Sequence, residues 1–299
     1  MIGEFVRSNE RKTWFPAFLT KVARIVVHPS GLVGILLLIP IVALVIVNSG
    51  MIRWDPNALN FNALLEGPST RHVMGTDQMG RDQLARIGHA IPIAVAIPVG
   101  AVAIALAIGS GIGLLAGYLG GIWERFLMGV TDIFLAMPVL LLAVFIIGVF
   151  GEGLTNTMIA IAIIYAPRFS RIARGSTLKI KYLPYVDAAR IAGTHPVKLI
   201  FKHIIPGIFP ELLVMATLSI SNALITQSAL SFLGLGLVPP QADLGGMLSA
   251  SVPFVNLAPW LMWFPALTIT CMILSFNLIG DAVRDVVDPR VSRSKYAAT

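Results

Sequence analysis

The chain has little charge for its length. Only 12% of its 299 residues are Asp, Glu, Lys or Arg, whereas 56% are hydrophobic and the mean hydropathy is +0.83. An average soluble domain has about 25% charged residues, and half that share cannot cover a globular surface with groups that water solvates well. The composition excludes an ordinary soluble enzyme, a disordered chain and a fibrous protein, and it indicates a membrane protein with several spans.

Cysteine and catalytic motifs are also scarce. The one cysteine, Cys271, lies in an apolar run, so an intramolecular disulfide and a cysteine-based zinc site are both excluded. The five histidines are scattered without ligand spacing, and the sequence has no H-E-x-x-H, G-x-S-x-G or Walker A motif. We therefore predict no catalytic residue, no metal ligand and no ATP hydrolysis by this chain itself.

Six apolar runs are candidates for membrane-spanning helices. A spanning helix needs about 20 mainly apolar residues, and none of the runs alternates as a barrel strand does. The runs cover Gly31–Met51, Ile91–Leu115, Ile133–Phe150, Leu154–Tyr165, Ile208–Leu230 and Pro259–Ile279. The sequence predicts an all-α polytopic membrane protein with six transmembrane helices, of which the fourth is the shortest.

The basic residues are unevenly divided between the two sides that six spans create. With the N-terminus placed inside, 18 of the 22 lysines and arginines lie on its side of the membrane. Cytoplasmic loops carry an excess of Lys and Arg, so both termini are predicted to be cytoplasmic. This topology explains the net charge of +7, and no nucleic-acid partner is expected.

The spans and the charge pattern divide the chain into five parts. The expected parts are a cytoplasmic tail over 1–30, a first span over 31–51, an extracytoplasmic loop over 52–90, a core of five helices over 91–281 and a cytoplasmic tail over 282–299. The core contains a basic cytoplasmic loop at about 168–206, in which the positive charge is densest.

The basic loop contains a short helix followed by a sharp bend. Pro184 suits the start of a helix, Gly193 suits a left-handed stop, and Thr194 is a possible cap for the next helix. The first helix has only about seven residues, which is too short to be stable alone in water. We therefore expect it to be held by docking onto something.

The same segment resembles the EAA loop of bacterial ABC-importer permeases. Asp187-Ala188-Ala189, then Gly193, then Ile205-Pro206 carry the resemblance, with Asp187 where Glu is usual and His203 where Ile is preferred. In that family the short helix is the coupling helix, which sits in a groove of the cytoplasmic ATPase subunit. The resemblance implies that the ATPase-coupling residues are Tyr185, Asp187, Ala188, Ala189, Arg190, Gly193 and Pro206.

Three further segments resemble the dipeptide/oligopeptide/nickel permeases. They are Gly75–Asp82, which reads GTDQMGRD, Leu230–Gly236 followed by Pro239-Pro240, and Phe276–Asp281. The resemblance covers about residues 30 to 290 and is to the C-type subunit, with Leu244 where the family usually has Trp. That departure puts the contact with a binding protein in doubt.

The resemblance implies a type I ABC-importer permease fold in the bacterial inner membrane. It also implies four kinds of partner, namely a homologous B-type permease subunit, two ABC ATPase subunits, an extracytoplasmic substrate-binding protein and membrane lipid. ATP and Mg would be bound by the ATPase subunits, and no cofactor is expected in this chain.

The outward segment Gly75–Asp82 could serve either of two roles. Gly75 and Gly80 predict tight turns, and Asp77–Arg81 and Asp82–Arg86 would be supporting ion pairs if the segment were helical. The segment is then either a folded cap on the outer mouth or a gate or docking surface for a binding protein. The candidate residues are Gly75, Thr76, Asp77, Gly80, Arg81 and Asp82.

The fifth span is the most polar, and Ser219, Asn222 and Thr226 share one of its faces. Polar side chains at membrane depth normally face protein or a water-filled path. We predict that this face lines the translocation path, with hydrogen bonding between helices as the alternative.

Together these features predict the permease subunit of an ATP-driven importer for peptides or a similar small solute. An ion-gradient-driven transporter is the alternative, but it would need paired carboxylates near the membrane midplane, which the spans lack. A scaffold subunit without a path is opposed by the polar face of the fifth span. The solute stays open among dipeptides, oligopeptides, glutathione, nickel, opines and oligosaccharides.

Overall fold

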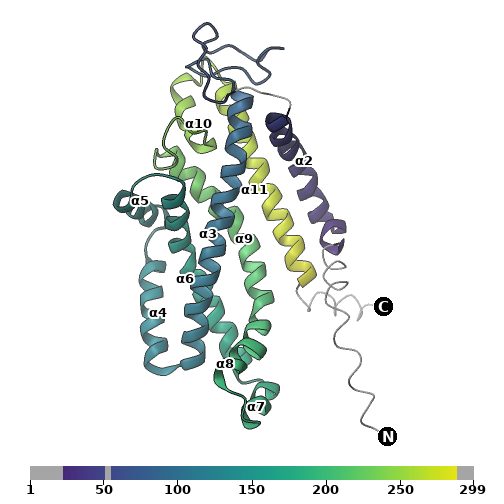
Figure 1. Cartoon of the computed structure of the whole chain (residues 1–299), viewed down its shortest axis with the longest axis vertical. Coiled ribbons are helices and arrows are strands. Elements are labelled where there is room, and N and C mark those ends of the chain that lie inside the picture. The colour runs from purple at the N-terminus through teal and green to yellow at the C-terminus, as the bar shows by residue number, and fades with distance from the viewer. Residues whose placement is uncertain (1–22, 51–54, 288–299) are drawn as a thin grey trace.

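The computed structural model describes residues 23–50 and 55–287, and its regular elements there are helices (Figure 1). The α-helices are α2 (Pro29–Gly50), α3 (Gln83–Leu119), α4 (Gly121–Ala136), α5 (Val139–Phe150), α6 (Leu154–Lys181), α7 (Pro184–Ile191), α8 (Pro196–Leu199), α9 (Ile205–Phe232), α10 (Leu244–Ser251) and α11 (Trp260–Val287). A π-helical turn, η1 (Ile200–Ile204), joins α8 to α9, and a 3-10 turn, η2 (Val252–Phe254), follows α10.

The long helix α3 is the centre of the arrangement. It packs along α6 and also contacts α9, while α11 lies between α9 and α2. Figure 1 shows the segment before α3 at one end of the molecule and α7 at the opposite end. At 1.5 Å per residue the 37 residues of α3 extend for about 55 Å, so this helix reaches from the first end far toward the second.

Four helical stretches in the described residues are long and apolar enough to cross a membrane. They are Pro29–Val47, Gln83–Leu119, Pro196–Phe232 and Trp260–Val287. The pair α4 and α5 adds a fifth if the two bent helices count as one span. The all-helical, multi-span character predicted from the sequence is confirmed at this level.

The third predicted span is not one continuous helix. The run Ile133–Phe150 is divided at Met137 and Pro138, where α4 and α5 meet at an angle of 99°. Proline lacks a backbone N–H and drives the preceding residue away from helical geometry, and Met137 has the extended dihedral angles φ −84° and ψ 138°. The predicted third span therefore corresponds to two helices that meet at a bend, and the pair can still count as one span.

Three predicted boundaries also differ from the structure. The fourth run ends at Tyr165 in the sequence interpretation, but α6 continues to Lys181, so the predicted loop at 168–206 begins as helix. The helix α3 begins at Gln83, inside the predicted loop 52–90, and α11 continues to Val287, beyond the predicted boundary at 281. Charged residues ended the apolar runs without ending the helices.

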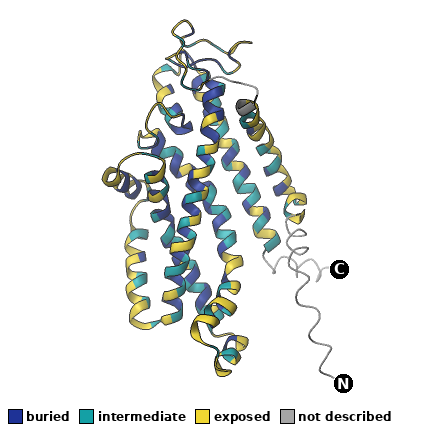
Figure 2. Ribbon diagram, in the orientation of Figure 1, coloured by how far each residue is buried: buried dark blue, intermediate teal, exposed yellow. Residues whose placement is uncertain are grey.

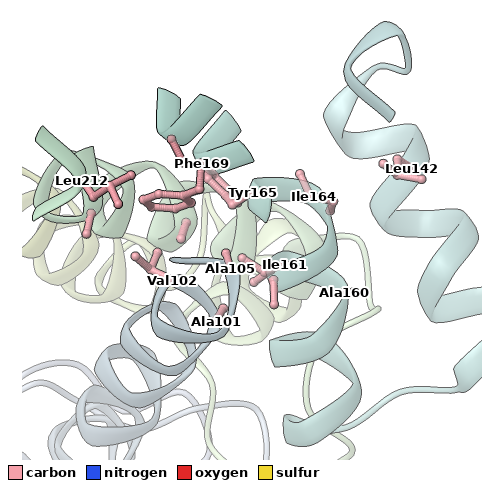
Figure 3. Close-up of a cluster of buried hydrophobic side chains, with 14 of the residues drawn as sticks. Ala101, Val102, Ala105, Leu142, Ala160, Ile161, Ile164, Tyr165, Phe169 and Leu212 are labelled. Carbon is pink, nitrogen blue, oxygen red and sulfur yellow. The ribbon is translucent and has the colours of Figure 1, made fainter. Parts of the chain in front are cut away.

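The larger core cluster lies where α3, α6 and α9 meet. Val102 and Ala105 of α3, Ile161 and Phe169 of α6 and Leu212 of α9 belong to this cluster (Figure 3). The backbones of α3 and α6 come so close that a Cβ on Gly113 would overlap the carbonyl oxygen of Ser170. Helix α6, which leads to α7, is therefore packed tightly against α3, which begins at the opposite end of the molecule.

Candidate functional site

The short helix α7 is formed as the sequence predicts. Pro184 is its first residue, and Gly193 has a φ of +79°, the left-handed conformation expected at a helix stop. The backbone N–H of Gly193 donates to the Arg190 carbonyl at 3.0 Å. The predicted cap at Thr194 was wrong, because His195 is the residue before α8 and its Nδ1 accepts from the Val197 N–H at 3.4 Å.

Most side chains of α7 are exposed or partly exposed. Val186 is its one buried residue, whereas the side chains of Tyr185 and Ile191 are 49% and 87% exposed. Figure 2 shows the same contrast, with α7 largely exposed at its end of the molecule. An eight-residue helix is not stable alone in water, so this one has the properties of an element that a partner covers.

The predicted coupling residues lie on both faces of α7 and beyond it. Arg190 pairs with Asp187 at 2.7 Å, and both side chains are about half exposed. Ala188 is exposed, whereas Ala189 packs partly against the core cluster. Pro206, the second residue of α9, is exposed.

Exposed apolar side chains near the bend extend the surface of α7. Ile191, Val197 and Phe201 are 87%, 54% and 68% exposed. The sequence did not single them out, because the exposure of an apolar side chain depends on how the helices pack. It becomes visible once the helices are placed.

Salt bridges tie α6 to its neighbours on the same side of the molecule. They join α6 to α4 and α9 through three pairs, Arg171–Asp132, Arg174–Glu124 and Lys179–Glu211. In addition, the Ser176 hydroxyl donates to the Glu211 carboxylate. The positive charge of this region is therefore partly used within the chain, and the two carboxylates Asp132 and Glu211 have structural partners.

The opposite end of the molecule is built around the segment Gly75–Asp82. The Thr76 hydroxyl donates to the Ala63 carbonyl at 2.5 Å and accepts from the Glu66 N–H at 2.9 Å. Asp82 caps α3 by accepting from the Ala85 N–H at 2.8 Å, and its other carboxylate oxygen lies 2.8 Å from Nδ1 of His72. These polar groups are buried, and they hold the segment against the start of α3.

The segment is a pair of turns and not a helix. Gly75 and Gly80 have φ values of +77° and +71°, which confirms the predicted tight turns. The predicted Asp77–Arg81 pair forms with Nε of Arg81 2.6 Å from the carboxylate. The predicted Asp82–Arg86 pair does not form, because Asp82 caps α3 and Arg86 instead lies 3.8 Å from Asp77.

A cavity of about 250 Å³ lies beside this segment. Its walls come from three regions, the outward segment with the start of α3, the loop and helix around α10, and the start of α11. Charged or polar lining residues include Asp77, Arg81, Arg86 and Asp243. The cavity thus brings the outward motif together with the segment that precedes α11.

Asp243 is the buried carboxylate on the α10 side of the cavity. Burial raises the pKa of Asp243 above its ordinary value, while hydrogen bonds from Ser231 and from the backbone N–H groups of Gly245 and Gly246 oppose that rise. The next residue, Leu244, is only 1% exposed. Its side chain therefore belongs to the core of this chain.

The three polar residues of the fifth span do not share one environment. Ser219 and Thr226 are buried, and the Thr226 hydroxyl lies 3.2 Å from the Tyr165 hydroxyl of α6. Asn222 is exposed, and its side-chain amide donates to the Leu218 carbonyl at 3.2 Å. Of the predicted path residues, Asn222 is the one whose side chain is accessible in this chain, while Ser219 and Thr226 face its interior.

The chain matches a known protein family and several named relatives. Residues 109–293 match the family described as binding-protein-dependent transport system inner membrane component. The chain is 39% identical over 255 residues, 84% of each chain, to glutathione transport system permease protein GsiD of Escherichia coli O6:K15:H31. It is 36% identical over 287 residues to di/tripeptide transport system permease protein DppC of Pseudomonas aeruginosa, covering 94% of this chain and 95% of the relative.

Solved structures share the fold. An inward-facing structure of the MetNI methionine ABC transporter contains a chain that matches with a TM-score of 0.55 and 18% identity. The match covers 68% of this chain and 96% of that one. The fold found here is thus that of a transporter chain, whatever the solute.

Proposed function

The chain belongs to the family of binding-protein-dependent transport system inner membrane components, and from this premise we propose that it is the permease subunit of an ATP-driven importer of short peptides. Relatives similar over more than four fifths of their length are named for glutathione, itself a tripeptide, and for di- and tripeptides. These names support a peptide as the solute. We infer that the path carries molecules of two or three residues.

The geometry of α7 is the observation that carries the proposal. The helix has one buried side chain, an exposed ion pair and an exposed Ile191 beside the exposed Val197 and Phe201, and this group of exposed apolar side chains supports a partner surface here. We infer that two ABC ATPase subunits supply that surface, one of them to this chain, and that they hold the ATP and Mg. Closure of the ATPases would then move α7, and the movement would pass to α6 and α9 on either side of it.

The arrangement in the membrane follows from the same proposal. We propose six spans, formed by α2, α3, the bent pair α4 and α5, α6, α9 and α11, with both termini in the cytoplasm. The first end of the molecule, with Gly75–Asp82 and the cavity, would then face outward to an extracytoplasmic binding protein. A homologous B-type permease subunit and membrane lipid would cover the remaining apolar surface.

The transport path would run beside α9. The exposed Asn222 supports this placement. The buried Ser219 and Thr226 would pack behind the residues that line the path. The alternative of an ion-gradient-driven transporter is not adopted, because the family depends on a binding protein.

A matched pair of substitutions tests the assignment of α7. Replacement of the exposed Ile191 by Gln should weaken co-purification of the ATPase subunits with the permease, since the contact would lose apolar area. Leu257, which is 68% exposed at the opposite end of the molecule from α7, provides the control. Leu257→Gln should leave co-purification of the ATPase subunits unchanged. Equal retention of the ATPases by both variants would contradict the proposal.

Transport itself is tested at Gly193. Proline has a fixed φ near −65° and cannot adopt the +79° found there, so Gly193→Pro should abolish uptake of a labelled dipeptide by the full assembly in proteoliposomes. The variant should still insert in the membrane, because the loop has open space around Gly193. Normal uptake in a well-expressed variant would count against the role of α7, and absence of peptide uptake by the unaltered assembly would overturn the peptide assignment.

A further inference from the structure

Arg168 of α6 differs from the other cations of this helix. The other four each have an oxygen partner, in the pairs Arg171–Asp132, Arg174–Glu124, Lys179–Glu211 and Lys181 with the Tyr118 carbonyl. Arg168 has no carboxylate or carbonyl partner within residues 23–50 and 55–287. Its recorded contact is with the ring of Tyr165, whose centroid lies 5.1 Å from the guanidinium carbon.

The contact places Arg168 beside the junction of α6 and α9. The Tyr165 hydroxyl lies 3.2 Å from the Thr226 hydroxyl, which in turn donates to the backbone carbonyl of Asn222 at 2.9 Å. Figure 3 shows Tyr165 at the core where α3, α6 and α9 meet. Arg168 is half-buried, and Asn222 is the exposed polar side chain on the α9 side. Tyr165 therefore links Arg168 of α6 to the turn of α9 that runs from Asn222 to Thr226.

The chemistry of this group of residues suits a carboxylate. A guanidinium over an aromatic ring keeps its edge of N–H donors free, and that edge matches the two oxygens of a carboxylate. Half burial removes part of the hydration of the Arg168 guanidinium, and no carboxylate of the described residues takes its place. The three paired neighbours on α6 show that carboxylates are available to this helix, yet none is placed at Arg168.

We propose that Arg168 binds the C-terminal carboxylate of the peptide solute as it passes alongside the junction of α6 and α9. The exposed side-chain oxygen of Asn222 is an acceptor on the opposite helix for an N–H group of the same solute. The inference rests on the proposed function, because it takes a short peptide as the transported molecule. It assigns to the permease a preference for the free carboxylate, in addition to the selection made by the binding protein.

The experiment compares a dipeptide with its C-terminal amide. The full assembly, in proteoliposomes with its binding protein, is measured with each compound for the unaltered chain, Arg168→Gln, Arg168→Lys and Arg171→Gln. The preference of the binding protein cancels when variants are compared, because the same binding protein is used in each assembly. Arg171→Gln is the matched control, since it removes an arginine one turn further along α6 that already has a carboxylate partner.

We expect Arg168→Gln to lower uptake of the free dipeptide by about tenfold and to change uptake of the amide little, because a charged hydrogen-bond partner is lost only for the acid. Uptake of the free dipeptide by Arg168→Lys should lie between that of the unaltered chain and that of Arg168→Gln, since lysine keeps the charge and loses the bidentate geometry. Arg171→Gln should affect both compounds alike. Equal loss of both compounds in Arg168→Gln would overturn the inference in favour of a lipid phosphate or a carboxylate of the partner permease, and no loss of either would overturn it outright.

The outcomes separate this inference from the function on which it rests. If the unaltered assembly takes up neither compound, the peptide function itself fails. If the unaltered assembly takes up the dipeptide and Arg168→Gln has the same ratio of acid to amide, only the role of Arg168 fails.

Discussion

The outward segment, as Gly75–Asp82 was named from the sequence, and the bend at Gly193 use similar residues in opposite ways. In the outward segment the side chains of Asp77 and Asp82 are 7% and 5% exposed and are held by partners of the same chain. At the bend the side chain of Asp187 is 44% exposed, and its partner Arg190 is equally open. The polar side chains of the first region are paired and buried within the subunit, whereas those of the second are paired but exposed.

Physical chemistry explains why the two regions differ. A buried carboxylate must have its hydrogen bonds satisfied, so the outward segment fixes each polar group in one geometry. A short exposed helix gains little from its own chain and takes its stability from what docks on it. The comparison predicts that substitutions in Gly75–Asp82 should destabilise the isolated subunit. Equivalent substitutions at the bend should weaken only its assembly with partners.

The largest contrast is expected between two glycines of positive φ. At Gly80 (φ +71°) a Cβ would overlap the Asn60 carbonyl, whereas at Gly193 (φ +79°) a Cβ would meet open space. Gly80→Ala should destabilise the detergent-solubilised permease by about 3 kcal/mol or more, since backbone must move to relieve the overlap. Gly193→Ala should cost only about 1 kcal/mol, from the strained left-handed backbone.

Thermal unfolding of the two alanine variants measures this contrast. A melting temperature lowered equally by both substitutions would break the distinction between a packed outer end and an open inner end. Unchanged stability in Gly80→Ala would show that the outward segment is not packed as described.

A medium effect is expected at two aspartates. Asp82→Ala removes the cap of α3 and the partner of His72, and the loss should be about 2 kcal/mol in unfolding free energy. Asp187→Ala removes an exposed ion pair, and the loss should stay below about 1 kcal/mol. Chemical denaturation of both variants gives the comparison, and an Asp187 effect as large as that of Asp82 would contradict it.

The smallest effect is a pH dependence at Asp243. Burial raises the pKa of Asp243, so the folded state favours the protonated carboxyl group. Ionisation therefore destabilises the fold, and this destabilisation is absent below the ordinary pKa of 3.8. As pH rises through the raised pKa, the unaltered chain should lose stability relative to Asp243→Asn, which cannot ionise.

Melting temperatures of the two proteins at pH 4, 6 and 8 measure the difference. The amide also alters the hydrogen bonds from Ser231 and the glycine N–H groups, but that contribution is the same at each pH. A difference that does not change with pH would contradict a raised pKa for Asp243, and so the burial of this carboxylate at the cavity.

Local sequence signals predicted the helix α7 correctly. Pro184 and Gly193 act through backbone geometry within a few residues, so the start and stop of the helix follow from the residues alone. The same reasoning missed the cap at His195, where two adjacent residues could serve. It also placed the start of a loop at Arg168, because a charge ended the apolar run although the helix continues to Lys181.

Contacts between distant segments could not be read from spacing. The interval between Asp82 and Arg86 is the same as that between Asp77 and Arg81, yet only the second pair forms. Which pair forms depends on which N–H groups lie nearest to each carboxylate in the folded chain. The face of α9 was likewise predicted from helical periodicity, which groups Ser219, Asn222 and Thr226 but does not say where α6 packs.

The sequence by itself determined that this is a membrane protein with several apolar helices and that a short helix interrupts the basic region. These properties follow from composition, hydropathy and local backbone preference, which act over a few residues. Only the tertiary structure decided that Asp77 pairs with two arginines, that the third span is bent, and that Arg168 lies beside Tyr165 with no carboxylate partner among residues 23–50 and 55–287. Such features depend on which side chains meet when helices far apart in the chain pack together. A polar group that this packing buries is destabilising unless it finds a hydrogen-bond partner.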